Sequence, residues 1–150
     1  MELNYSAEEP EKVILKGARR KLNYNVIELS ESELKELWNK EENKDVPYDY
    51  FAKEHKYVYN SLVMGGAQWN YGGIVNAIVR EKYSIDEMEA ITNNMAAINA
   101  VFMQTLVSGG IVDAIKYLKE SADSDDTAAF KEMQEWRQVA KREAKGVLKL

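Results

Sequence analysis

The 150-residue chain contains no cysteine and one histidine, His55. The absence of cysteine excludes disulfide bonds, thiolate zinc sites, iron–sulfur clusters and a cysteine nucleophile. A single histidine excludes any site that needs two. Catalysis would have to use carboxylate, lysine, tyrosine or serine side chains, and no arrangement of these in the sequence indicates an active site. We therefore expect no enzymatic activity, no cofactor and no metal site.

Acidic residues outnumber basic ones, with 25 Asp and Glu against 20 Lys and Arg, and the formal net charge is −5. This balance argues against general nucleic-acid binding but allows local basic patches. The first twelve residues, MELNYSAEEPEK, are acidic and polar where a secretory signal has basic residues followed by an apolar run. We therefore expect a cytoplasmic protein.

The first predicted element is a β-hairpin over residues 12–29. It has a short apolar run from Val13 to Leu15, a turn with basic residues at Gly17, and a second run with alternating apolar side chains (Leu22, Tyr24 and Val26). Residues 1–11 are expected to form a flexible segment. The rest of the chain, residues 12–150, is expected to be a single helical domain that begins with this hairpin.

Helical signals dominate after the hairpin. Ser30 with Glu33, and Ser84 with Glu87, have the spacing of capping boxes, in which a serine hydroxyl and a glutamate carboxylate bond to free N–H groups at a helix start. Another helix is expected to follow Pro47, which suits a first helical turn. Its apolar stripe would consist of Phe51, His55, Val58 and Leu62.

The clearest helical pattern follows Ser84. Apolar residues recur there at spacings of three and four (Ile85, Met88, Ile91, Met95, Ile98, Phe102 and Leu106). Gly109 and Gly110 should break this helix, because glycine is unfavourable in helix interiors. A last amphipathic helix carries Phe130, Met133, Trp136, Ala140, Ala144 and Val147. We therefore predict a mainly α fold, a helical bundle of about five to six helices with a small N-terminal β-hairpin.

Two segments contain no charged residue, namely Tyr57 to Val79 and Thr92 to Val112. Each has about 20 residues, which is enough to span a bilayer. Both carry side-chain amides and Gly-Gly pairs, and amides are costly in hydrocarbon, so we expect no membrane insertion. Two interpretations stay open. The segments form the buried centre of the domain, or they form an assembly interface, where charged residues are depleted.

Residues 57–73, YVYNSLVMGGAQWNYGG, mix aromatic side chains with Asn, Ser, Gln and Gly. This mixture is typical of protein-binding surfaces, because aromatic rings supply rigid contact area and small polar side chains supply adaptable hydrogen bonds. Two further tyrosines lie just upstream. We predict a protein interface formed by Tyr48, Tyr50, Tyr57, Tyr59, Trp69 and Tyr71.

Basic residues gather in two places. One set lies at the turn of the predicted hairpin, and the other is spaced by four along the last helix. Basic residues near a helix C-terminus also complement the helix dipole, so the second set needs no ligand. We predict that these residues contact either nucleic acid or an acidic partner protein: Lys16, Arg19, Arg20, Lys21, Arg137, Lys141 and Lys145.

The stretches NYGGIVNAIVREKYSIDEMEAITNN (residues 70–94) and FKEMQEWRQVAKREAKGVLKL (residues 130–150) resemble small uncharacterised proteins of phages and prophages of gut anaerobes. The hairpin followed by a helix is also similar to the start of phage tail-assembly chaperones. The resemblance implies a virion or host-cytoplasm setting and assigns no residue roles. We therefore predict a non-enzymatic protein–protein assembly or adaptor protein, as a homo-oligomer or with another protein. The alternative is a nucleic-acid-associated accessory or regulatory protein.

Overall fold

The computed structural model describes all 150 residues, and the chain forms two compact units. Residues 1–78 and 141–150 form one unit, which we call the sheet unit. Residues 79–140 form the other, which we call the hairpin unit. We describe each unit by itself.

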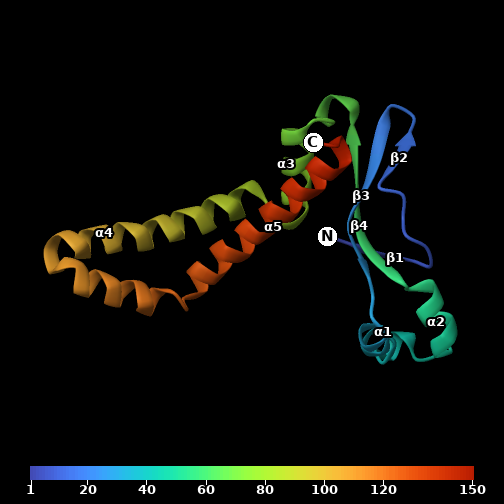
Figure 1. Cartoon of the computed structure of the whole chain (residues 1–150), viewed down its shortest axis with the longest axis horizontal. Coiled ribbons are helices and arrows are strands. Elements are labelled where there is room, and N and C mark those ends of the chain that lie inside the picture. The colour runs from blue at the N-terminus through green and yellow to red at the C-terminus, as the bar shows by residue number, and fades with distance from the viewer. The chain divides into compact units, whose positions relative to one another are not determined.

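The sheet unit is built on a four-stranded antiparallel sheet (Figure 1). Its strands are β1 (Leu3–Ser6), β2 (Val13–Lys16), β3 (Arg19–Glu28) and β4 (Tyr57–Gly65), in the spatial order β1-β4-β3-β2. The predicted hairpin is confirmed, because β2 pairs with β3 through a turn in which Gly17 has a φ of +61°. That φ favours glycine over other residues.

The predicted fold class is wrong, because the sheet makes this an α+β fold and not a helical bundle with a small hairpin. The helix expected after Pro47 ends at Glu54, and the next segment, Tyr57–Gly65, is the central strand β4. This strand is rich in aromatic and branched residues, and its side chains alternate between the two faces of the sheet. Helical and strand periodicities coincide over so short an apolar run, so spacing alone did not separate them.

Residues 1–11, expected to be a flexible segment, include β1. This strand pairs with β4 from Leu3 opposite Asn60 to Ser6 opposite Tyr57. The side-chain amide of Asn60 also donates to the backbone oxygen of Glu2 at 3.2 Å. Partners more than 50 residues away in the chain therefore make this segment a strand.

The core of the sheet unit lies on one face of the sheet. The helix α3 (Tyr71–Lys82) and the C-terminal part of α5 (Asp125–Leu148) cover this face (Figure 1). Sheet residues and helix residues are both fully or almost fully buried there: Leu22, Tyr24, Leu62, Met64, Ile74, Ile78 and Ala144. The buried stripe predicted for the last helix therefore includes Ala144 within this core.

Two short helices connect β3 to β4. Helix α1 (Glu31–Trp38) begins with the predicted capping box of Ser30 and Glu33. A 3-10 turn (Glu41–Asn43) and helix α2 (Tyr48–Glu54) follow. The indole Nε1 of Trp38 donates to the backbone oxygen of Val46 at 2.7 Å, which closes the loop between the two helices.

The hairpin unit consists of α4 (Ile85–Ser121), the part of α5 up to residue 140, and the end of α3. The capping box of Ser84 and Glu87 is present at the start of α4. The predicted break is also present, because Gly110 has a φ of +80° and a ψ of −179°, and α4 reverses direction there (Figure 1). Residues 85–109 form what we call the first arm, and residues 111–140 form the returning arm, with the tip at Gly109 and Gly110.

Candidate functional site

The six aromatic residues predicted to form an interface lie in different parts of the sheet unit. Tyr50 on α2 has 71% of its surface exposed, and the other five are half-buried. Tyr57 and Tyr59 share one face of β4. Trp69 and Tyr71 come after the C-terminal end of that strand. Tyr48 packs edge-on against Trp38, with ring centroids 5.6 Å apart.

The predicted basic cluster at the β2–β3 turn is divided by the sheet. Lys16 pairs with Arg19 across the turn, and Lys21 lies two residues further along, so these three side chains share one face. Arg20 lies on the other face, where its guanidinium carbon is 5.0 Å from the centroid of the Trp69 ring. None of the four forms an ion pair.

The basic residues of α5 fall in both units. Arg137 belongs to the hairpin unit, and Lys141 and Lys145 belong to the sheet unit. All three are exposed and none forms an ion pair. The repeat of four residues places them along one side of α5.

The two charge-free segments have different structural roles. The first, residues 57–79, runs through β4 and α3 and contributes buried residues to the sheet unit (Asn60, Leu62, Met64, Ile74 and Ile78). The second, residues 92–112, forms most of the first arm and the tip, and none of it is fully buried. The second segment is therefore an uncharged surface of the hairpin unit.

One polar contact joins the two arms of the hairpin, and another joins the end of α3 to the returning arm. The side-chain amide of Asn94 donates to a carboxylate oxygen of Asp126 at 3.0 Å. Nearer the base, the ammonium of Lys82 donates to the carboxylate of Glu132 at 2.7 Å and lies 5.4 Å from the centroid of the Trp136 ring. The hydrogen bond to Glu132 raises the pKa of Lys82 above its ordinary value.

The first arm directs one apolar stripe toward the returning arm. This stripe is half-buried and has spacings of three and four residues (Met88, Ile91, Met95, Ile98, Phe102 and Leu106). On the returning arm, Ala114, Met133 and Trp136 are buried. The remaining sides of the first arm have nothing packed against them within the unit.

A second apolar stripe lies on the same side of both arms. On the first arm, Met103 directly follows the inward Phe102, and on the returning arm Ile115 directly follows the buried Ala114. Each residue along an α-helix is rotated by about 100° around the helix axis from the residue before it. Where two antiparallel helices pack against each other, the residues that directly follow their inward-facing residues therefore lie on the same side of the pair. Met103 and Ile115 are therefore neighbours on one broad side of the hairpin.

The base of the hairpin supports this geometry. Arg137 directly follows the buried Trp136, so the same rotation places it on the side of Met103 and Ile115. A shallow hollow there is lined by Arg137 together with residues of the first arm (Ile85, Met88, Glu89, Thr92 and Asn93).

We call this side the hairpin face. Its residues recur at spacings of three and four on each arm, and all of them are exposed: Thr92, Ala96, Asn99, Met103, Val107, Ile111, Ile115, Leu118 and Ala122. The exposed fractions reach 56% at Met103, 65% at Ile111 and 86% at Val107. These nine residues are uncharged, and Arg137 lies on the same side nearer the base.

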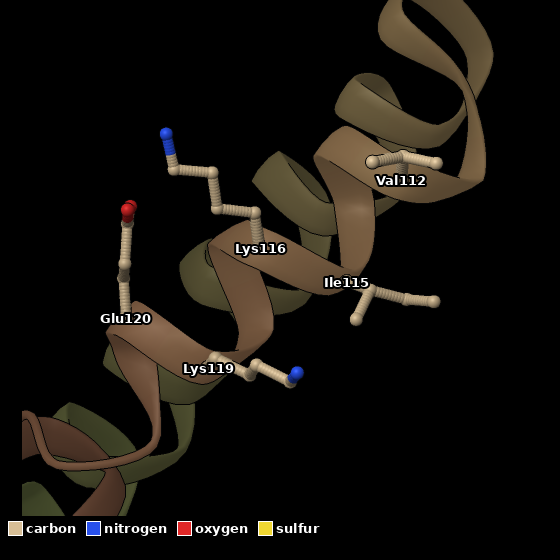
Figure 2. A pocket seen from close by; sticks show the side chains of 5 residues that line it. All are labelled: Val112, Ile115, Lys116, Lys119 and Glu120. Atoms are coloured by element: carbon tan, nitrogen blue, oxygen red, sulfur yellow. The ribbon is translucent and has the colours of Figure 1, made fainter.

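Near the tip, two charged side chains of the returning arm lie off this face, Lys116 and Glu120, and Lys119 lies at its edge. Val112, Ile115, Lys116, Lys119 and Glu120 line a shallow hollow on the outside of that arm. Figure 2 shows the side chains of Lys116 and Glu120 pointing to one side of the helix and those of Ile115 and Lys119 pointing to the other. The charges therefore border the hairpin face without interrupting it.

The structure brings no three His, Asp or Glu side chains together as a potential metal site. By length and composition α4 is the one helix that is apolar enough to cross a bilayer, and its most apolar window is not buried. No protein-family model, no curated protein and no solved structure matches the chain.

Sequence reasoning found the segment that carries the hairpin face but not the face itself. The charge-free residues 92–112 and the break at Gly109 and Gly110 are both evident from the sequence. The second heptad-like stripe, at Thr92, Ala96, Asn99 and Met103, was a usable signal. This stripe is hard to recognise in the sequence because it includes small and polar residues, whereas the inward stripe next to it consists of large apolar residues.

Proposed function

We propose that this chain is a non-enzymatic assembly protein, and that its assembly surface is the hairpin face. The observation that carries the proposal is a two-helix surface of nine uncharged residues that no other part of the hairpin unit covers. A helix that is apolar on several sides needs a partner or a membrane to bury it. This is the function predicted from the sequence, but we assign the interface to the hairpin face and not to the six aromatic residues.

The exposed apolar residues of the surface support an interface. Five large apolar residues of the hairpin face are at least 40% exposed (Met103, Val107, Ile111, Ile115 and Leu118). Contiguous apolar patches on a protein surface often mark an interaction site. Depletion of charge together with exposed Met and branched residues is also the composition of interface centres.

Several features favour a protein partner over a lipid one. The first arm contains Asn93, Asn94, Asn99 and Gln104, whose amides are costly in hydrocarbon. Asp113 and Lys116 follow the tip within two turns, so deep insertion of the tip would bury charges. The hydroxyls of Thr92 and Thr105 bond to backbone oxygens four residues earlier, at 2.7 and 2.8 Å, so they are satisfied in a dry interface.

The setting that accompanies this proposal is phage or prophage virion structure or morphogenesis, in a virion or in the host cytoplasm. Its support is the resemblance of residues 70–94 and 130–150 to small phage and prophage proteins. The physical argument for assembly does not depend on that setting.

Native mass tests the proposal. We expect light scattering on a sizing column to give a multiple of 17.2 kDa that persists in moderate salt, because apolar burial is not screened. Met103→Glu should weaken the association by at least about tenfold, because it buries an unpaired charge in each copy. Val101→Glu is the matched control. Val101 directly precedes the inward Phe102, so it lies on the opposite side of the same arm, and 42% of it is exposed.

Two results would contradict this function. One is a wild-type monomer at every concentration over a tenfold range. The other is an equal effect of Met103→Glu and Val101→Glu on the native mass, with both variants folded by circular dichroism.

The alternative, a nucleic-acid-associated accessory or regulatory protein, is supported by one observation. Lys16, Arg19 and Lys21 lie on one face of the sheet and none of them forms an ion pair. Binding of single-stranded or double-stranded DNA at low ionic strength, lost in a triple alanine variant at these positions, would favour this function. No binding at low salt would eliminate it, because phosphate contacts are strongest there.

A further inference from the structure

We propose that the hairpin faces of two copies pack against each other with their tips at the same end. The product is a four-helix bundle with a two-fold axis along the hairpin. This inference rests on the proposed function, and it identifies the partner of the hairpin face as a second copy of the chain.

The spacing of the face favours a second hairpin as its partner. Spacings of four, three and four residues occur on the first arm from Thr92 to Met103, and again on the returning arm from Ile111 to Ala122. This spacing is the pattern by which helices interlock in bundles. The hairpin face of each copy therefore has two rows of side chains, one on each arm. A surface that can interlock with them is another pair of helices with side chains at the same spacing. A two-fold dimer supplies such a surface, because both partners then use the same patch.

The contact between Asn94 and Asp126 sets which residues lie at the same height along the hairpin. Asn94 lies 16 residues before Gly110, since 110 − 94 = 16, and Asp126 lies 16 residues after it, since 126 − 110 = 16. Residues equally far from Gly110 are therefore level with one another. Met103, seven residues before the tip, is nearly level with Leu118, which is eight residues after it.

The distribution of charge decides the direction of pairing. The nine uncharged residues of the hairpin face lie in the half of the hairpin near the tip, where Lys119 borders the face at its edge. Acidic residues lie toward the base, with Asp123, Asp125 and Asp126 on the returning arm. With the tips together, uncharged surface covers uncharged surface along the full face. With the tips opposed, the apolar tip of one copy would lie over these acids in the other, which costs desolvation without a charge partner.

In the tips-together arrangement, the first arm of each copy packs on the returning arm of the other. Met103 then meets Leu118 of the second copy, and Asn99 meets Ala122, so a large or polar residue faces an apolar or small one. The two Ile111 side chains come together near the axis. With the tips opposed about the middle of the uncharged part of the first arm, near residue 100, the two tips would instead lie about 30 Å apart, from a rise of 1.5 Å per residue.

Disulfide cross-linking tests this arrangement, because the chain has no cysteine and each introduced thiol is the only one present. We expect Ile111→Cys to form a disulfide-linked dimer under mild oxidation. Val112→Cys is the matched control, because it is the next residue, is 76% exposed and is rotated by about 100° around the helix from Ile111. A mixture of Met103→Cys and Leu118→Cys should yield the mixed dimer in preference to either homodimer.

The outcomes separate this inference from the function on which it rests. An oligomer in which Ile111→Cys does not cross-link, and in which Met103→Cys joins Ala96→Cys, would overturn the arrangement and leave assembly intact. A monomeric wild-type protein would overturn both. Flotation of the protein with phosphatidylcholine vesicles, lost in Met103→Glu, would assign the face to lipid and would also overturn both.

Discussion

The side-chain amide of Asn94 donates a 3.0 Å hydrogen bond to the carboxylate of Asp126, across the two arms of the hairpin. We expect Asn94→Ala and Asp126→Ala each to lower the free energy of unfolding. The double variant should cost less than the sum of the two, with a coupling of about 0.5–1.5 kcal/mol for one hydrogen bond. Denaturant unfolding of the four proteins measures this coupling. A strictly additive double variant would show that the bond contributes nothing in solution.

The reversal at Gly110 should depend on glycine. Its φ of +80° with a ψ of −179° lies in a region that other residues avoid, so Gly110→Ala should destabilise the hairpin by about 1–3 kcal/mol. Gly65→Ala is the control, because Gly65 has a φ of −75° and open space where a Cβ would lie. Thermal unfolding should separate the two variants. An equal and small shift for both would argue against the strained turn.

Two adjacent glycines at the start of α3 should respond in opposite ways. A Cβ on Gly73 would collide with the backbone oxygen of Gln68, so Gly73→Ala should destabilise the protein by about 1–3 kcal/mol. A Cβ on Gly72 would meet the side chain of Asn70 at an ordinary distance of 3.7 Å. Gly72→Ala should therefore be neutral or stabilise the helix by up to about 1 kcal/mol. Unfolding midpoints that move in the same direction would contradict this reading of the close approach.

Acid should weaken the start of α4 through Glu87. The backbone N–H of Ser84 donates to the Glu87 carboxylate at 2.7 Å, and this bond lowers the pKa of Glu87 below its ordinary value of 4.5. The stabilisation is therefore present above that ordinary value and is lost as the pH falls through the lowered pKa of the folded state. Glu87→Gln should flatten the fall of the unfolding midpoint between about pH 5 and pH 3. Glu89→Gln, outside the capping box, should behave like the wild type.

The elements that the sequence predicted well are those set by near neighbours. Both capping boxes, the β2–β3 hairpin with its turn at Gly17, and the break at Gly110 depend on residues only a few positions apart. The stripe of α5 that includes Met133, Trp136 and Ala144 was also evident, because a long helix repeats its apolar spacing many times.

The strand β4 shows where local pattern was insufficient. Residues 57–65 satisfied a helical spacing and an alternating one, and pairing with β3 and β1 decided between them. Those strands lie about 40 to 55 residues earlier in the chain, so no short window of sequence contains the deciding contacts. The basic cluster is a similar case, because the pleat of the sheet, which separates Arg20 from its neighbours, follows from the register with β2.

The two charge-free segments show most clearly what the sequence determined and what the tertiary structure decided. From the sequence alone, residues 57–79 and 92–112 were equally uncharged, and each could be core or interface. Composition determined that both need an apolar environment, because uncharged apolar side chains gain free energy when they leave water. Only the tertiary structure decided that the first segment finds this environment inside the sheet unit, whereas the second keeps the hairpin face exposed, because burial depends on which distant residues fold against each side of a helix or strand.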